Sequence, residues 1–322
     1  MSIKNIFTEF LPSKWGRWIV RQSARRRFWT ALKLLHDEKR GKLDLKDNLS
    51  ICAMFRNEAS YLREWIEYHL LVGVDRFYLF DNESTDDSKK VLQPYIDSGI
   101  VVYEYVADAT LESFRIKFGE RSEKSGVAHW MGTHKCRKST KWSIFIDPDE
   151  FIVPKKDGTI TKFLSRFDRH VTQIILGWNV YGSNGHKTRP AGLVIESYTR
   201  RGQGRNGMDE RGNFKALINP RAILLDRNHY HIALGKCVDE TGRFTKIWID
   251  EEKKRIFPTN ICCVNHYIVR SHEECMRKLA NNKNIHIWRY TDKFFDKYDC
   301  NDIEDLTILK WSDAVKKKIS GK

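Results

Sequence analysis

The chain has 322 residues, with 57 lysines and arginines against 42 acidic residues, a net charge of +15, and 41 % hydrophobic residues. This composition excludes an intrinsically disordered chain and suits one large or two smaller globular domains. No stretch reaches the roughly 20 apolar residues that a membrane span needs, and the N-terminus lacks the apolar region of a secretory signal. The seven cysteines include no C-x-x-C pair, which favours reduced thiols and a cytoplasmic location.

The basic excess is concentrated at the N-terminus. Residues 1–36 carry eight lysines and arginines, a single acid and the tryptophans Trp15, Trp18 and Trp29. Apolar residues recur there at spacings of three, four or seven, which predicts a basic amphipathic helical extension over residues 1–46. Two interpretations are open: peripheral contact with an anionic membrane surface on its cytoplasmic side, or a helix packed on the main domain. A second basic stretch predicts a helical C-terminal tail over residues 286–322.

Residues 49–105 alternate between short apolar runs and amphipathic helical segments. Strands are predicted at 49–55, 76–80 and 100–105, with a helix after each of the first two. This order predicts an α/β fold with a largely parallel sheet and right-handed crossovers, and 142–146 is a further strand. Ligands of such sheets bind at the carboxyl ends of the strands. Polar residues follow three of these strands there, namely Arg56, Asn57 and Glu58; Asp81 and Asn82; and Asp147, Asp149 and Glu150.

Asp147 and Asp149 stand two residues apart at the end of the strand predicted at 142–146. Their side chains would therefore project to the same side of the chain. Paired carboxylates bind a hard divalent cation such as Mn²⁺ or Mg²⁺, which would neutralise a nucleotide diphosphate as it leaves. A capped turn with solvated acids is the competing interpretation of so short a motif.

Several longer blocks of sequence accompany these carboxylates. They lie at residues 55–58, 64–69, 73–75, 78–84, 145–151, 182–186 and 265–267. Together they resemble the family 2-like and family 92 glycosyltransferases of GT-A fold. The resemblance implies a GT-A domain over residues 47–285, with a mostly parallel, Rossmann-like sheet flanked by helices. Asn82 departs from the pattern, because many family 2 members carry a second aspartate at that position.

The resemblance also implies an activity: a metal-dependent, inverting transfer of a sugar from a nucleotide-sugar donor to a glycan or lipid-linked saccharide. A UDP-sugar is the expected donor, with galactose a common choice. Asp147 and Asp149 would hold Mn²⁺ or Mg²⁺, and a late histidine commonly completes such a metal shell. His229, His231 and His266 are the candidates for it, with His231 slightly preferred over His266. The donor pocket would be lined by Arg56, Asn57, Glu58, Asp81, Asn82 and Asp147.

An inverting transfer needs a carboxylate to take the proton of the acceptor hydroxyl. Glu196, Asp209 and Glu210 are the candidates, Glu150 is a less favoured one, and spacing does not choose among them. A phosphatase or phosphoryl transferase could use the same D-x-D pair, but Phe151 stands where such enzymes carry threonine. A nucleic-acid-binding protein is disfavoured because the charge is concentrated in one arm. The expected partners are a nucleotide-sugar donor, a saccharide acceptor and an anionic membrane surface.

Overall fold

The structure is a computed structural model that describes residues 14–118, 124–203, 213–226, 229–246, 256–281 and 292–321. The alternation predicted for the first half of the chain is confirmed. β1 (Asp47–Phe55), β2 (Arg76–Asp81) and β3 (Val101–Tyr105) are joined by α3 (Ala59–Leu71) and α4 (Ser88–Asp97). These strands pair in parallel with β2 in the middle, because each is an apolar run that helices can cover on both faces.

The remaining strands complete one nine-stranded mixed sheet and form two small two-stranded sheets, β9 with β10 and β7 with β13. The other strands are β4 (Thr140–Phe145), β5 (Glu150–Val153), β6 (Val171–Val180), β7 (Arg200–Arg201), β8 (Phe214–Ile218), β9 (Ile223–Asp226), β10 (His231–Ala233), β11 (Lys236–Asp239), β12 (Cys263–His266) and β13 (Ile303–Glu304). The other helices are α2 (Lys14–Lys39), α5 (Asp108–Phe118), α6 (Lys124–Cys136), α7 (Ile160–Leu164), α8 (Val194–Ser197), α10 (His272–Asn281), α11 (Asp292–Tyr298), η2 (Thr307–Trp311) and α12 (Ser312–Ser320).

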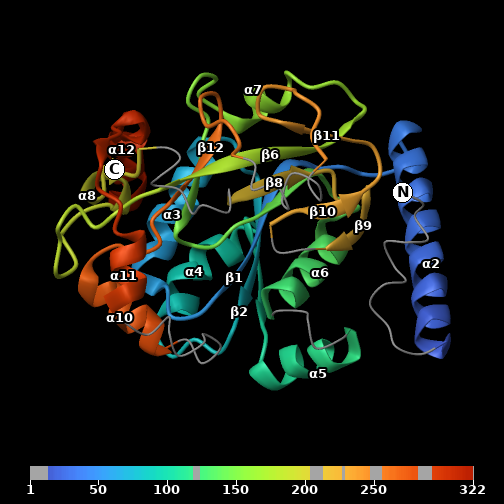
Figure 1. The fold of residues 1–322 in the computed structure, drawn as a ribbon, viewed down its shortest axis with the longest axis horizontal. Helices are drawn as coiled ribbons and strands as arrows, with labels where there is room; N and C mark the ends of the chain where they lie inside the picture. The colour runs from blue at the N-terminus through green and yellow to red at the C-terminus, as the bar shows by residue number, and fades with distance from the viewer. Residues whose placement is uncertain are drawn as a thin grey trace.

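The main sheet has the strand order β3-β2-β1-β4-β8-β6-β12-β5, and β11 pairs with β6. β4 is parallel to β1, whereas β8 runs antiparallel between β4 and β6. β12 is parallel to β6 and antiparallel to β5. The predicted mostly parallel, Rossmann-like sheet flanked by helices is therefore confirmed (Figure 1). The register of β12 on β5 pairs His266 with Glu150, which brings a late part of the chain to the end of β4.

Helix α3 ties the first half of the sheet to β5. Trp65 is fully buried and donates its indole N–H to the carbonyl of Glu150 at 2.8 Å. Tyr68 donates its hydroxyl to the carbonyl of Ile152 at 3.0 Å. Between these two contacts, His69 accepts the backbone N–H of Ile152 at 3.2 Å. Because α3 satisfies polar groups of β5 as well as burying apolar surface, it holds the turn before β5 in place.

The C-terminal segment is part of the same core. Ile308 and Val315 are buried in the main hydrophobic cluster, and Trp311 packs edge-on against Tyr68 with ring centroids 5.7 Å apart. A C-terminal tail separate from the domain, as we expected for residues 286–322, does not fit these contacts. Because Ile308 and Val315 are buried there while Leu306 is 49 % exposed, the described part of this segment packs on the domain through part of its apolar side chains.

The N-terminal helix α2 stands at one side of the molecule, opposite the C-terminal helix α12 (Figure 1). Its inner face packs on the domain through Ala31 and Leu34, which are both buried. Trp29 on the outer face is 59 % exposed and Leu32 is 37 % exposed. The interpretation of this segment as a helix packed on the main domain therefore holds for its inner face. It does not account for the exposed apolar side chains of the outer face. Among the described helices, none is long and apolar enough to cross a bilayer.

Candidate active site at the strand ends

Asp149 lies in the turn between β4 and β5 and is only 2 % exposed. Its Oδ2 forms an ion pair with Nζ of Lys278 from α10. Its Oδ1 has no hydrogen-bond partner among the described residues and lies 3.6 Å from Nε2 of His266. Burial alone would raise the pKa of Asp149, but Lys278 and His266 outweigh it and hold the pKa well below its usual range. Asp149 is therefore an ionised carboxylate with one oxygen available to a ligand.

A buried lysine sits beside this carboxylate. Lys215 of β8 places its Nζ 3.0 Å from Oε2 of Glu150 and 3.4 Å from Oδ2 of Asp147. Glu150 is fully buried and also accepts the backbone N–H of Asp147 at 2.9 Å. Burial raises the pKa of Glu150 to about 7, although Lys215 acts in the opposite direction. The side chain of Asp147 is 55 % exposed and faces solvent. Glu150 stabilises the turn through its hydrogen bond to the backbone of Asp147.

The structure separates the candidate histidines. His266 lies beside Asp149 and packs edge-on against Trp178, with ring centroids 4.4 Å apart. His229 contacts the same tryptophan at 5.5 Å, and burial with the nearby Lys215 lowers the pKa of His229 to about 4. His231 instead lies 3.4 Å from Asp226, and none of its described contacts joins it to Asp149. The geometry therefore favours His266 over His231 as the late histidine of the site.

The fit of a divalent cation can be judged from the donor atoms. Among the described residues, no three His, Cys, Asp or Glu side chains are grouped as metal ligands. Asp149 Oδ1 and His266 nevertheless supply two donors, and Oδ1 is a buried oxygen without a hydrogen bond. Mg²⁺-type cations are commonly held by one or two carboxylates together with substrate phosphates. The residues thus fit a cation that the protein shares with a diphosphate ligand.

The ends of β1 and β2 carry the residues predicted to line the donor pocket. Asp81 is buried and accepts the backbone N–H of Ser84 and the hydroxyl of Tyr103, both at 2.8 Å. Asn57 has a φ of 57° and accepts the backbone N–H of Thr85 at 2.7 Å. Asn57 therefore ties the loop after β1 to the loop after β2.

The other three predicted pocket residues have partners of their own. Asn82 donates to Asp108 at 2.9 Å and to the carbonyl of Val106 at 3.1 Å. Arg56 lies 3.8 Å from Glu83. Glu58 pairs with Nη1 of Arg270 at 3.1 Å, and Arg270 is also close enough to Asp149 to lower its pKa. Glu58 and Arg270 therefore connect the end of β1 to the carboxylate centre.

The predicted base candidates have different positions. Glu196 forms an ion pair of 2.5 Å with Lys316 and accepts the hydroxyl of Ser312, so its contacts hold it against α12. Burial opposes its ionisation, but these partners lower the pKa of Glu196. Asp209 and Glu210 lie outside the described residues. The choice of a base among these three stays a prediction.

Sequence reasoning assigned no role to the cations of this site. Lys215, Lys278 and Arg270 all reach the carboxylates, from β8, from α10 and from the loop before α10. A weak signal existed for Lys215, a lone lysine in an otherwise apolar strand, because a buried lysine needs a buried acid. Lys278 belongs to a sequence block that resembles the family but carried no assigned role, and no local pattern distinguishes Arg270 from a surface cation.

The sequence is similar to known proteins over most of its length. Residues 47–318 match the sequence family described as glycosyltransferase family 92. A family 92 protein of Ricinus communis is 28 % identical over 214 residues, which cover 63 % of this chain and 35 % of that protein. One from Oryza sativa subsp. japonica is 27 % identical over 194 residues, covering 58 % and 30 %. The chain thus spans about a third of the length of the curated relatives it matches.

Solved structures show weaker likeness. The crystal structure of S. aureus TarS 1-349 is 11 % identical and covers 78 % of this chain and 70 % of that chain, with a TM-score of 0.37. Glucosyl-3-phosphoglycerate synthase from Mycobacterium tuberculosis, solved with Mn²⁺, uridine diphosphate and glucosyl-3-phosphoglycerate, is 18 % identical. That match covers 47 % of this chain and 48 % of the synthase, with a TM-score of 0.26.

The described residues thus gather carboxylates at the strand ends of a mostly parallel sheet. Because the family match extends over most of the sequence, the chain belongs to glycosyltransferase family 92. The resemblance found in the sequence blocks is thereby confirmed, and so is the glycosyltransferase class. The phosphoryl-transferase and nucleic-acid-binding alternatives are not supported.

Proposed function

We propose that the protein transfers a sugar from a UDP-sugar, with UDP-galactose the first donor to test, to a hydroxyl of a glycan or lipid-linked saccharide. The observation that carries this proposal is the buried, ionised Asp149, whose Oδ1 lies beside His266 and has no hydrogen-bond partner among the described residues. A buried, charged oxygen without a hydrogen bond destabilises the folded protein unless a ligand binds to it. Family 92 membership supports a nucleotide sugar as that ligand.

Each of these residues would have a separate role in such a transfer. Asp149 and His266 would hold Mn²⁺ or Mg²⁺, with the exposed Asp147 close by. A divalent cation bound there would neutralise the negative charge of the diphosphate leaving group. Lys278 and Arg270 add positive charge on the same side, and they can contact phosphate oxygens directly. Asp81, at the end of β2, would contact the nucleoside. The inverting outcome expected from the resemblance requires a base, for which Glu196, Asp209 and Glu210 stay the candidates.

Thermal unfolding of the full chain tests the donor and the metal together. A ligand that binds only the folded protein raises its melting temperature. We expect UDP and UDP-galactose to raise it in the presence of Mn²⁺ and to have little effect after chelation. ADP-glucose and GDP-mannose serve as controls. A chain that responds to none of these nucleotides with or without Mn²⁺ would refute the proposed donor class.

We also propose that the outer face of α2 contacts an anionic membrane surface from the cytoplasmic side. Arg25, Trp29, Leu32 and Lys33 recur at helical spacing, and all four are exposed. Tryptophan settles at the headgroup level of a bilayer while arginine and lysine pair with anionic lipids. Such contact would bring the active site close to lipid-linked acceptors.

A further inference from the structure

Lys278 of α10 reaches the same buried carboxylate that would hold the cation. Its Nζ forms an ion pair with Oδ2 of Asp149. Oδ1 of the same carboxylate has no hydrogen-bond partner among the described residues and lies 3.6 Å from Nε2 of His266. A divalent cation bound between Oδ1 and His266 would therefore share one carboxylate with the ammonium group of Lys278.

The charge of this carboxylate is already balanced by the protein. Asp149 is 2 % exposed, and its negative charge is matched by that of Lys278. Like charges that lie close together repel one another strongly where little water screens them. A divalent cation that arrives without an anion would add its charge beside this neutral pair. Lys278 thus keeps Asp149 ionised and at the same time opposes a second cation.

Buried donors of Arg270 call for an anion at the same place. Nη1 of Arg270 pairs with Glu58 at 3.1 Å, but its Nε and Nη2 are buried without a hydrogen-bond partner among the described residues. The positive charge of Arg270 acts on both Asp149 and Lys278. Guanidinium and ammonium groups form strong hydrogen bonds with phosphate oxygens. A diphosphate would supply the negative charge that allows the cation, Lys278 and Arg270 to lie together.

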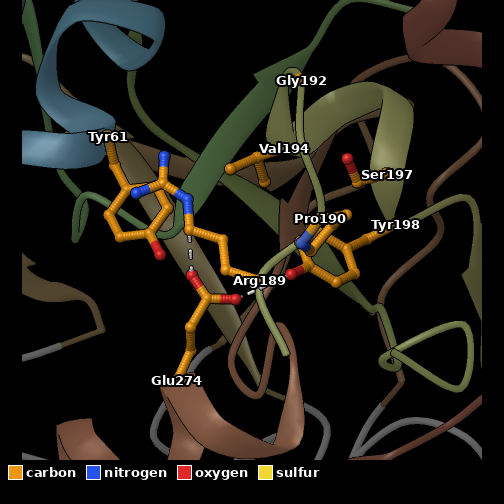
Figure 2. A pocket seen from close by; sticks show the side chains of 8 residues that line it. All are labelled: Tyr61, Arg189, Pro190, Gly192, Val194, Ser197, Tyr198 and Glu274. Atoms are coloured by element: carbon orange, nitrogen blue, oxygen red, sulfur yellow. Dashed lines mark hydrogen bonds and ion pairs between the residues drawn. The ribbon is translucent and has the colours of Figure 1, made fainter. Parts of the chain in front are cut away.

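The helix that carries Lys278 is fixed one turn before this residue. Glu274 of α10 accepts the hydroxyl of Tyr198 at 2.8 Å. Figure 2 shows Glu274 facing Tyr198 and Arg189, and the pocket beside them measures about 10 Å³, room for a single water. The side chain of Lys278 is 41 % exposed, in contrast to this tightly packed helix start. Lys278 can therefore leave Asp149 by rotation of its own long side chain while α10 stays in place.

We propose that Lys278 makes metal binding conditional on the diphosphate. It repels a cation that arrives alone, and it moves from Asp149 to the phosphate oxygens when a nucleotide diphosphate is bound. The inference rests on the glycosyltransferase function proposed above. By thermodynamic linkage, the factor by which Mn²⁺ strengthens UDP binding equals the factor by which UDP strengthens Mn²⁺ binding. The protein would take up the cation and the diphosphate together.

Mn²⁺ binding to the full chain without nucleotide, measured by electron paramagnetic resonance of the free ion, tests the role of Lys278. Lys278→Met removes the charge of the side chain and keeps most of its length. We expect this variant to bind Mn²⁺ about tenfold more tightly than the wild type, because the opposing charge is gone. Mn²⁺ should also raise the melting temperature of the variant more than that of the wild type, and the same unfolding curve shows that the variant is folded.

Two further variants serve as controls. Lys278→Arg keeps the positive charge and should bind Mn²⁺ as weakly as the wild type. Lys135→Met removes a lysine of similar exposure, 39 % at its side chain, which pairs with Glu104 of β3 at 2.6 Å. It should leave the Mn²⁺ affinity unchanged, because it lowers the net charge of the protein without changing the contacts of Asp149.

Calorimetric titration of the same proteins with UDP measures the coupling between the two ligands. We expect Mn²⁺ to strengthen UDP binding by a larger factor in the wild type than in Lys278→Met. An equal factor in both proteins would overturn the proposal. So would a nucleotide-free Mn²⁺ affinity that does not rise in Lys278→Met, or that rises as much in Lys278→Arg or Lys135→Met. A wild type that binds no UDP with or without Mn²⁺ would instead refute the proposed donor class, and the nucleotide-free Mn²⁺ affinities would still decide the role of Lys278.

Discussion

His266 Nε2 lies 3.6 Å from Oδ1 of Asp149, a buried oxygen with no hydrogen-bond partner in the described part of the chain. The pairing of β12 with β5 sets this approach, because it aligns His266 with Glu150, the residue after Asp149. On its other side Asp149 is neutralised by Lys278. The carboxylate is therefore kept ionised before any cation arrives, which favours metal binding at neutral pH.

Asp149→Asn should remove the metal dependence of nucleotide binding. The amide oxygen is a weaker ligand for a hard cation and leaves Lys278 without its partner. We expect UDP affinity in the presence of Mn²⁺, measured by calorimetry, to fall about tenfold or more. Asp168→Asn is the control, because Asp168 has an exposed ion pair with Lys236 at 3.8 Å. Unchanged Mn²⁺-dependent affinity in Asp149→Asn would show that the carboxylate does not bind the metal.

Asp81→Asn should weaken UDP and UDP-sugar to the same extent, about tenfold, if Asp81 contacts the nucleoside that both ligands share. Asparagine keeps an acceptor for the backbone N–H of Ser84, so the turn is preserved. Tyr103→Phe removes the other hydrogen bond of Asp81 without changing its charge, and separates a local structural effect from a binding effect. An Asp81→Asn variant that binds free UDP normally would contradict the assignment.

Arg221→Met should destabilise the fold by about 3–5 kcal/mol, because it breaks a buried charge network. Arg221 is fully buried, pairs with both carboxylate oxygens of Glu38 at 2.8 and 2.9 Å, and donates to the carbonyl of Lys141 at 2.7 Å. Glu38→Gln should cost less, since the carbonyl partners of Arg221 remain. Urea denaturation of both variants measures the difference. Equal losses would mean that the α2 contact carries the whole effect.

His69 should stay neutral far below the usual pKa of histidine. Burial lowers the pKa of His69 to about 3. The ring also has a single suitable tautomer, because Nδ1 faces the carbonyl of Trp65 and Nε2 faces the N–H of Ile152. The unfolded chain takes up this proton below about pH 6.5, so His69 favours unfolding progressively as the pH falls from 6.5 toward 3. Imidazole nitrogen NMR shifts that titrate between pH 5 and 7 would contradict this.

Trp29→Ser should reduce co-sedimentation of the full chain with anionic vesicles at low salt, because it removes a large apolar side chain that is 59 % exposed on the outer face of α2. Replacing Arg25 and Lys33 with serine should reduce it further, by up to about 1 kcal/mol for each charge, and high salt should mimic that loss. Tyr105→Ser is a matched control, since Tyr105 is also 59 % exposed. Equal vesicle binding by the wild type and all variants would contradict membrane contact by α2. The helix would then only pack on the domain.

The order of strands and helices up to β4 could be predicted because apolar periodicity is a local property of the sequence. The same alternation positioned Asp81, Asp147 and Asp149 at strand ends, and parallel strands gather their carboxyl ends at one edge. The C-terminal segment could not be assigned in this way. Its lysines suggested a separate tail, whereas Ile308 and Val315 are buried in the main core by contact with distant elements.

The sequence alone thus determined the fold class, the carboxylate cluster and the resemblance to family 92, all of which depend on neighbouring residues and short spacings. Only the tertiary structure decided that His266 rather than His231 lies beside Asp149, and that Lys215 and Lys278 neutralise the carboxylates. These contacts depend on the register of β12 on β5 and on the antiparallel insertion of β8. Such pairings join segments far apart in the chain, and their free energy comes from burial and charge neutralisation that no local pattern encodes.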